Sequence, residues 1–265
     1  MQRNLVEGQT DYTDETEFAG LNFQFTHFYA PSVPNVHEVR GIVGKLPISV
    51  VSHLVGCSYT GHGQAVLDAL SPFQLMSKAW ATRILRNLMW GPKGNYQHVE
   101  HVYIGSWFGQ QALLDHLDNH PSINGHCPGR GHTELIDKDE LAMIVARKIR
   151  EGFIDKEHDL ITYSVCDAMA KPLKWSDSKY PGIVVWNGLE HFHPREAAAY
   201  VQNAPAGTTF LCQATNMPAD DHQMLYHGTY AFSNLWGDRP VNIEAEGWMK
   251  CVVGTRYLVA FTVKD

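Results

Sequence analysis

The chain has 265 residues, which is long enough to bury a core as one α/β domain with an additional element or as two small domains. Hydrophobic residues make up 44% of it, yet no apolar run approaches the roughly 18 residues that a membrane span needs, so we expect no membrane association. The formal net charge of −7 argues against a broad phosphate-binding surface, and therefore against nucleic acid as a partner.

The start of the chain and its cysteines indicate a compartment. Residues 1–18 carry five acidic side chains and lack the hydrophobic segment of a secretory signal. The five cysteines are scattered without a Cys-x-x-Cys pair, which favours reduced thiols. Both features predict a cytoplasmic protein.

Few regular elements are predicted in residues 1–94. Residues 21–27 alternate in the manner of a short strand, and Ser71-Pro72 is a good helix start. A helix is predicted beyond it, because six apolar residues recur at helical spacing: Phe73, Met76, Trp80, Ile84, Leu88 and Met89. We interpret residues 1–94 as an N-terminal accessory region.

Strands and helices alternate regularly in residues 95–265, which predicts an α/β fold. Strands are expected at 99–104, 134–137, 160–165, 182–186 and 208–213, and helices at 110–117, at 139–150 and from Pro194 onward. The helix at 139–150 places four apolar residues on one face: Leu141, Ile144, Val145 and Ile149. After a loop at 215–240, the segments 241–252 and 256–263 lie too close together for a helical crossover, so they predict a hairpin.

A glycine turn separates the first of these strands from its helix. The segment Gly105-Ser106-Trp107-Phe108-Gly109 follows the strand directly. In parallel α/β folds such a turn holds a nucleotide-like ligand: the first glycine permits a tight turn, and the second lets the ligand approach the backbone and the helix N-terminus. Two glycines four positions apart are common, so the acids that follow in the sequence carry the argument.

Five βα units followed by a terminal hairpin resemble the class I S-adenosylmethionine-dependent methyltransferase superfamily over residues 95–265. The resemblance implies a Rossmann-like, mostly parallel sheet with an antiparallel C-terminal hairpin strand, and S-adenosylmethionine as the cofactor. It assigns Gly105, Ser106, Trp107 and Gly109 to the cofactor's methionine part. Asp137, at the end of the second strand, would bind the ribose hydroxyls, which a carboxylate can accept in bidentate fashion.

The resemblance extends to the ends of the third and fourth strands. Asp167, beside Cys166, matches the acid that contacts the adenine amino group, and we count both residues as cofactor-binding. The segment Asn187-Gly188-Leu189-Glu190-His191-Phe192 resembles the substrate-side loop. It implies Asn187, Glu190 and His191 as catalytic residues, with Asn187 also near the cofactor, and residues 1–94 as the part that shapes the acceptor site.

The sequence departs from the superfamily pattern at several points. Trp107 stands where a glycine is common, and Tyr103 where an acid is usual. Gly105 and Asp137 are 32 positions apart, which an insertion at 121–132 would explain. Neither the Asp/Asn-Pro-Pro-aromatic signature of amino-group nucleic-acid methylases nor a Pro-Cys nucleophile is present at the site, which argues against both subclasses.

Each candidate has a structural alternative. Asp137 or Asp139 could cap the following helix, Asp167 could cap its own turn, and His191 could be a surface histidine. As a catalytic group, His191 would be a general base. Further acceptor-side candidates follow the fifth strand: Asn216, Asp220, Asp221 and His222.

Fifteen histidines also raise the question of a metal site. The pair His126-Cys127 with His132, and the pair His191 and His193, have suitable ligand types. No second Cys/His pair at structural-zinc spacing accompanies either group, so the sequence predicts no metal site.

The expected function is methyl transfer from S-adenosylmethionine to an oxygen or nitrogen atom of a small-molecule acceptor, because the acidic balance disfavours nucleic acid. Three alternatives stay open. They are aminopropyl or aminobutyryl transfer by an enzyme of the same fold, a nicotinamide-dependent oxidoreductase, and a non-catalytic cofactor-binding scaffold subunit. The sequence does not indicate an oligomeric state.

Overall fold

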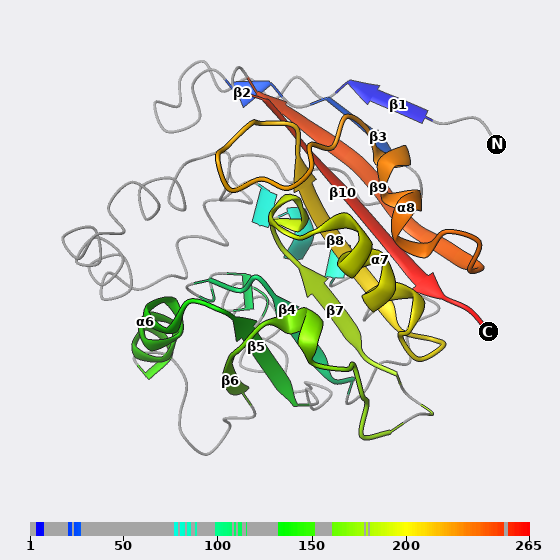
Figure 1. The fold of residues 1–265 in the computed structure, drawn as a ribbon. Helices are drawn as coiled ribbons and strands as arrows, with labels where there is room; N and C mark the ends of the chain where they lie inside the picture. The colour runs from blue at the N-terminus through cyan, green and yellow to red at the C-terminus, as the bar shows by residue number, and fades with distance from the viewer. Residues whose placement is uncertain are drawn as a thin grey trace, which may run out of the picture.

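The structure is a computed structural model, and it describes residues 4–7, 21–22, 24–27, 77–78, 80–82, 84–85, 88, 99–107, 109, 111–112, 115, 132–151, 161–177, 179, 181–251 and 254–265. An eight-stranded sheet with the strand order β2-β9-β10-β8-β7-β4-β5-β6 dominates this part of the chain (Figure 1). Its strands are β2 (Leu21–Asn22), β4 (His101–Ile104), β5 (Thr133–Asp137), β6 (Ile161–Val165), β7 (Ile183–Trp186), β8 (Thr209–Thr215), β9 (Val241–Cys251) and β10 (Gly254–Val263).

The centre of the sheet is parallel and one side of it is antiparallel. Strands β6, β5, β4, β7 and β8 run in the same direction, so their carboxyl ends meet at one edge. Strand β10 pairs antiparallel with both β8 and β9, and β9 pairs antiparallel with β2. Strands β1 (Asn4–Glu7) and β3 (Gln24–His27) form a separate antiparallel pair. The predicted mostly parallel sheet with an antiparallel C-terminal hairpin is confirmed.

Hydrophobic residues cover both faces of the sheet. On one face, helix α6 (Glu140–Glu151) and helical residues between 77 and 88 pack against the strands, and Trp80 and Ile84 are fully buried there. On the other face lie α7 (Pro194–Gln202) and α8 (Ser233–Trp236), seen in front of the sheet in Figure 1. Trp80 and Ile84 come from the region that we interpret as accessory, so that region contributes to the core of the sheet; the division at residues 94/95 stays a prediction.

Two local expectations were wrong. Helix α6 buries Ala142, Met143 and Ala146, whereas Ile144 is 43% exposed, so the predicted apolar face is wrong at Ile144. The side chains of Leu141, Val145 and Ile149 lie outside the described residues. Ala146 lies beside the glycine turn, since a Cβ at Gly109 would be 3.4 Å from the Ala146 Cβ. In addition, the segment 215–240, expected as a loop, contains the 3₁₀ turn η6 (Thr229–Phe232) and helix α8.

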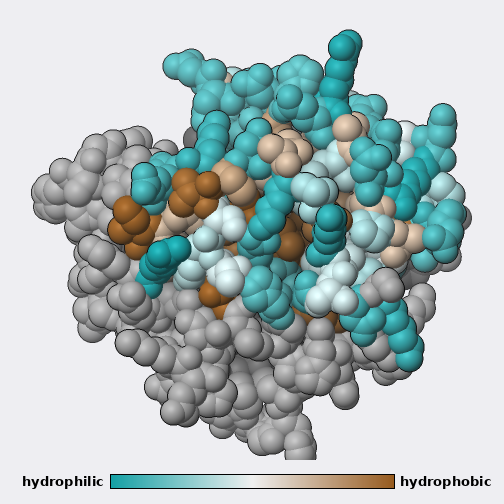
Figure 2. Space-filling model, turned by 60° about the horizontal axis from the view of Figure 1, so that its bottom comes forward, coloured by the Kyte–Doolittle hydropathy of each residue, from teal (hydrophilic) through white to brown (hydrophobic). Residues whose placement is uncertain are grey.

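Hydrophilic residues predominate on the described part of the face that Figure 2 shows, and hydrophobic residues occur on it in small groups. Among the described residues, no helix is long and apolar enough to cross a membrane.

A buried polar cluster joins the helical residues at 77–88 to the sheet. The Asp115 carboxylate accepts hydrogen bonds from Thr82 Oγ1, from Tyr103 Oη at 2.7 Å and from Gln111 Nε2 at 2.9 Å. Burial, and after it the nearby Arg256 guanidinium, lower the pKa of Lys78 to about 8, against the opposing influence of Asp115.

The depressed pKa of Lys78 predicts a pH dependence of stability. Between pH 8 and 10 the unfolded chain holds the Lys78 proton more tightly than the folded chain, so the free energy of unfolding should gain up to about 1.4 kcal/mol per pH unit from this group. Below pH 8 both states are protonated and the contribution is constant. Denaturant melts of the wild type and of Lys78→Met across this range measure how the free energy of unfolding changes with pH. The part of this change that comes from Lys78 should be missing in the variant. Parallel curves would contradict the burial of the charged amine.

Candidate active site

The predicted glycine turn lies at the carboxyl end of β4 and adopts backbone conformations that few residues tolerate. Gly105, Trp107 and Gly109 have φ values of +60°, +47° and +70°. A Cβ at Gly105 would lie 2.6 Å from the carbonyl oxygen of Asn187, so the turn also needs glycine there for the close approach of β7's end. Among the described residues other than glycine, only Trp107 has a positive φ. This strained conformation is typical of functional sites.

Asp137, at the end of β5, holds this turn in place. Its Oδ2 accepts the backbone N–H of Trp107 at 2.8 Å, and its Oδ1 accepts that of Asp139 at 3.0 Å. The cap of α6 is instead Asp139, whose Oδ1 accepts the N–H of Ala142 at 3.1 Å. The helix-cap alternative for Asp137 is therefore wrong. A carboxylate has about four acceptor positions, so two remain for a ligand.

Asp167 and Cys166 follow β6 at the same edge. Asp167 is exposed, and its Oδ1 accepts the N–H of Met169 at 2.9 Å, which caps the turn η4 (Ala168–Ala170). Asp167 therefore caps its own turn, as the structural alternative predicted, and it does so through one carboxylate oxygen. The half-buried Cys166 donates its backbone N–H to the Asp137 carbonyl at 3.0 Å, which keeps the ends of β5 and β6 together. An open groove of roughly 610 Å³ lies beside η4 and α7, and Asp167 is one of its lining residues.

The end of β7 supplies the substrate-side residues. Asn187 donates its backbone N–H to Ile104 at 3.1 Å, and its side-chain oxygen accepts from Gln213 at 2.9 Å. The turn η5 (Leu189–His191) follows, and it begins at Gly188, whose φ is +66°. The Glu190 carbonyl accepts the N–H of Gln223 at 2.7 Å. This bond fastens the loop after β8 to the turn after β7.

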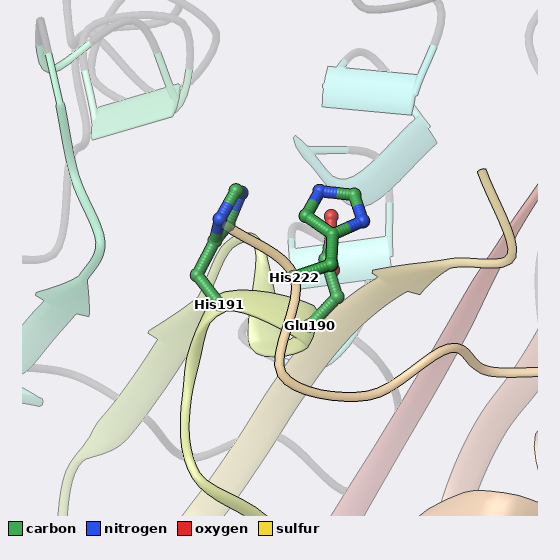
Figure 3. Close-up of side chains that lie close together, drawn as sticks. All are labelled: Glu190, His191 and His222. Atoms are coloured by element: carbon green, nitrogen blue, oxygen red, sulfur yellow. The ribbon is translucent and has the colours of Figure 1, made fainter. Parts of the chain in front are cut away.

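Three ionisable side chains meet where these two loops touch. The ligand atoms of Glu190, His191 and His222 all lie within 4.8 Å of one another, and Figure 3 shows the three side chains above the ends of β7 and β8. The two imidazole rings stand edge to face with their centres 4.6 Å apart. His191 Nδ1 lies 3.0 Å from Asp221 Oδ2, and His222 Nδ1 lies 2.7 Å from the Met217 carbonyl oxygen.

Comparisons with known proteins bear on the fold of the chain. No protein-family model matches the sequence, and no curated protein matches it. Among solved structures, geranyl diphosphate methyltransferase in complex with S-adenosylmethionine aligns with a TM-score of 0.51 at 12% identity, over 76% of this chain and 90% of that one. The CurJ carbon methyltransferase aligns with a TM-score of 0.50 at 12% identity, over 89% of this chain and 72% of that one.

The chain has the class I methyltransferase fold. Within this fold, the structure brings the predicted cofactor-side residues to one edge of the sheet: the glycine turn and Asp137 are joined by the hydrogen bond from Trp107, and Cys166 and Asp167 adjoin them. The predicted acceptor-side residues Asn187, Glu190 and His191 lie on the neighbouring strand end.

Other candidates do not join the cluster. His193 caps α7 by accepting the N–H of Arg195 at 3.3 Å, so the pair His191 and His193 does not form a ligand pair. Asn216 accepts the N–H of Thr255 at 2.7 Å and supports the hairpin. His132 lies 3.0 Å from Thr162, and its sequence neighbours at 126–127 lie outside the described residues.

Sequence reasoning missed the pairing of His191 with His222, since they are 31 positions apart on different loops. The available signal was that both follow strands expected to be neighbours in the sheet, and His222 was named only as a further candidate.

Proposed function

We propose that this chain binds S-adenosylmethionine and transfers its methyl group to an oxygen or nitrogen atom of a small-molecule acceptor. The proposal rests on what lies at one edge of the sheet. Adjacent parallel strands are followed there by a glycine turn, by a carboxylate that is hydrogen-bonded to this turn, and by a cluster of ionisable groups. In open α/β sheets, ligands bind outside the carboxyl ends of the strands.

The residues of the turn suit the cofactor. Asp137 keeps acceptor positions that two vicinal ribose hydroxyls could use, and the backbone of Gly105 to Gly109 has no Cβ at its two ends. The aromatic Trp107, held by Asp137, offers a surface for stacking. When bound, S-adenosylmethionine supplies a methyl group on a sulfonium, and its transfer depends mainly on alignment and desolvation.

On the acceptor side we assign proton removal to His191. The Asp221 carboxylate orients its Nδ1–H, which leaves the lone pair of Nε2 to accept a proton from an acceptor hydroxyl or amine. Glu190 is 2% exposed and Asn187 is half-buried, so both can shape the acceptor site beside it. The net charge of −7 favours a small molecule over nucleic acid, as before.

Product analysis tests the reaction. Incubation with S-adenosylmethionine and a panel of small hydroxyl and amine compounds should yield a product heavier by one methyl group, together with S-adenosylhomocysteine. A larger mass gain with release of methylthioadenosine would indicate aminopropyl transfer instead. Cofactor binding without turnover across the panel would favour a scaffold role. Nicotinamide fluorescence on titration would indicate an oxidoreductase, although the antiparallel β10 differs from the dinucleotide-binding strand order.

Asp137→Ala and Asp139→Ala form a matched pair for the cofactor site. Asp137→Ala should weaken S-adenosylhomocysteine binding by roughly 1.5–3 kcal/mol, the usual value for hydrogen bonds to a charged group. Asp139→Ala removes the cap of α6 and should cost about 1 kcal/mol of stability with unchanged affinity. Calorimetric titration and a denaturant melt measure both quantities. Equal affinities in the two variants would remove Asp137 from the cofactor site.

A further inference from the structure

We propose that Glu190, His191 and His222 bind a divalent transition-metal ion, a site that the sequence did not predict. Their ligand atoms lie within 4.8 Å of one another, and they come from two loops fastened together by the hydrogen bond from Gln223 to the Glu190 carbonyl. Two imidazoles and one carboxylate are the protein ligands of many catalytic zinc sites and of non-haem iron sites. This proposal goes beyond the proposed function, because ion binding needs no S-adenosylmethionine.

A polar partner at the Nδ1 atom of each ring suits both histidines for metal binding. Because a carbonyl oxygen can only accept, His222 Nδ1 must carry the proton in its contact with Met217, so the lone pair of the neutral ring is on Nε2. His191 Nδ1 lies 3.0 Å from the Asp221 carboxylate, which can only accept, so this neighbour also favours the proton on Nδ1. Metal-binding histidines almost always donate their other N–H to a carbonyl or a carboxylate. Both rings therefore have the tautomer that a metal requires.

The third ligand, Glu190, is a buried carboxylate. Glu190 is 2% exposed, and its Oε2 is buried without a hydrogen bond in the described part of the chain. A buried carboxylate without a donor is costly, so such groups usually pair with a charge or coordinate a metal. Its ligand oxygen lies within 4.8 Å of a ring nitrogen of each of the two imidazoles. A cation between the three groups would supply the missing partner.

The donor set also indicates the class of ion. Imidazole nitrogens suit zinc and iron, whereas magnesium and calcium prefer oxygen ligands. Around a tetrahedral ion with bonds of about 2.1 Å, ligand atoms lie about 3.4 Å apart, so the three side chains need to close by about an ångström. His191 is 42% exposed, so its side chain is not packed on all sides, and an ion with three protein ligands has coordination positions left. An acceptor hydroxyl could occupy one of them, and the bound ion, in place of the His191 imidazole, would then favour its deprotonation.

Metal titration of the full chain tests the site without any cofactor. Isothermal titration with Zn²⁺ should show one tight site per chain after chelator treatment, and Mg²⁺ should not compete for it. His222→Ala should weaken the tight site by more than about 100-fold. Asp221→Asn removes the negative charge next to His191 Nδ1 and should weaken it by about 10–100-fold. His227→Ala, an exposed histidine of the same loop, is the matched control and should bind Zn²⁺ like the wild type.

A spectroscopic measurement keeps the result decisive if His222→Ala does not fold. Co²⁺ bound to the wild type should give the visible absorption of a low-symmetry site with nitrogen ligands, and this band should decrease in Asp221→Asn, a change at a side chain that is 73% exposed. Unchanged Zn²⁺ binding and an unchanged Co²⁺ spectrum in Asp221→Asn and His222→Ala would overturn the proposal, whatever the outcome of methyl-transfer assays.

Discussion

Gly105→Val is expected to abolish S-adenosylhomocysteine binding. A β-branched side chain does not tolerate a φ of +60°, and its Cβ would lie 2.6 Å from the Asn187 carbonyl oxygen. The turn must therefore move away from the end of β7, and with it the Trp107 N–H that Asp137 accepts. Because the proposed cofactor site consists of this turn, calorimetric titration should detect no binding at concentrations that saturate the wild type.

Gly207→Val is the control for general strain. Gly207 has a φ of +83°, and its Cβ would lie 2.5 Å from a carbon of Pro181, but it precedes the amino end of β8, away from the glycine turn. Both variants should lose stability in a denaturant melt, and only Gly105→Val should lose affinity. A Gly105→Val protein that binds S-adenosylhomocysteine like the wild type would show that the glycine turn is not the cofactor site.

His191→Ala is expected to lower turnover by about 10²–10⁴-fold, the range typical of a lost general base, while cofactor affinity stays near the wild-type value. The separation follows from the geometry, since His191 is on the turn after β7 and Asp137 is on the end of β5. Single-turnover rates with an acceptor from the product screen, measured on chelator-treated protein, isolate proton transfer from any contribution of a bound ion.

His227→Ala provides the comparison for His191→Ala, because it removes an exposed histidine from outside the cluster and should leave turnover unchanged. Asp221→Asn should give an intermediate loss, since it weakens the orientation of the His191 ring but leaves its Nε2 in place. If His191→Ala turns over at the wild-type rate, the imidazole has no part in proton removal and alignment is the main source of catalysis.

Local patterns were sufficient to predict most elements of the sheet. The apolar run at 182–186 predicted a strand buried on both faces, and all four residues of β7 are buried. The short connection around Gly254 predicted the hairpin of β9 and β10. These predictions succeeded because a strand's burial and a hairpin's turn depend on residues that are adjacent in the sequence.

The buried face of α6 could not be predicted in this way. Its sequence has apolar residues on more than one arc, and periodicity favoured the arc with Ile144. Ile144 is exposed while the small side chains of Ala142 and Ala146 are buried, and the turn at Gly109 lies against Ala146. Only the tertiary structure determines how closely two elements approach, and this distance selects between a large and a small side chain.

The same distinction applies to the candidate site. The sequence by itself determined which chemical groups follow each strand: glycines after β4, Asp137 at the end of β5, and Glu190 and His191 after β7. The order of the strands then decided that these groups share one edge, since carboxyl ends of adjacent parallel strands lie together.

Only the tertiary structure decided which of these groups touch. Asp137 binds the glycine turn because the ends of β4 and β5 are neighbours, which left the cap of α6 to Asp139. His222 reaches His191 because the Glu190 carbonyl accepts the N–H of Gln223 and fixes the loop after β8. Contacts between loops that are far apart in the sequence depend on backbone hydrogen bonds, which any residue can make. The pattern of side chains therefore does not predict them.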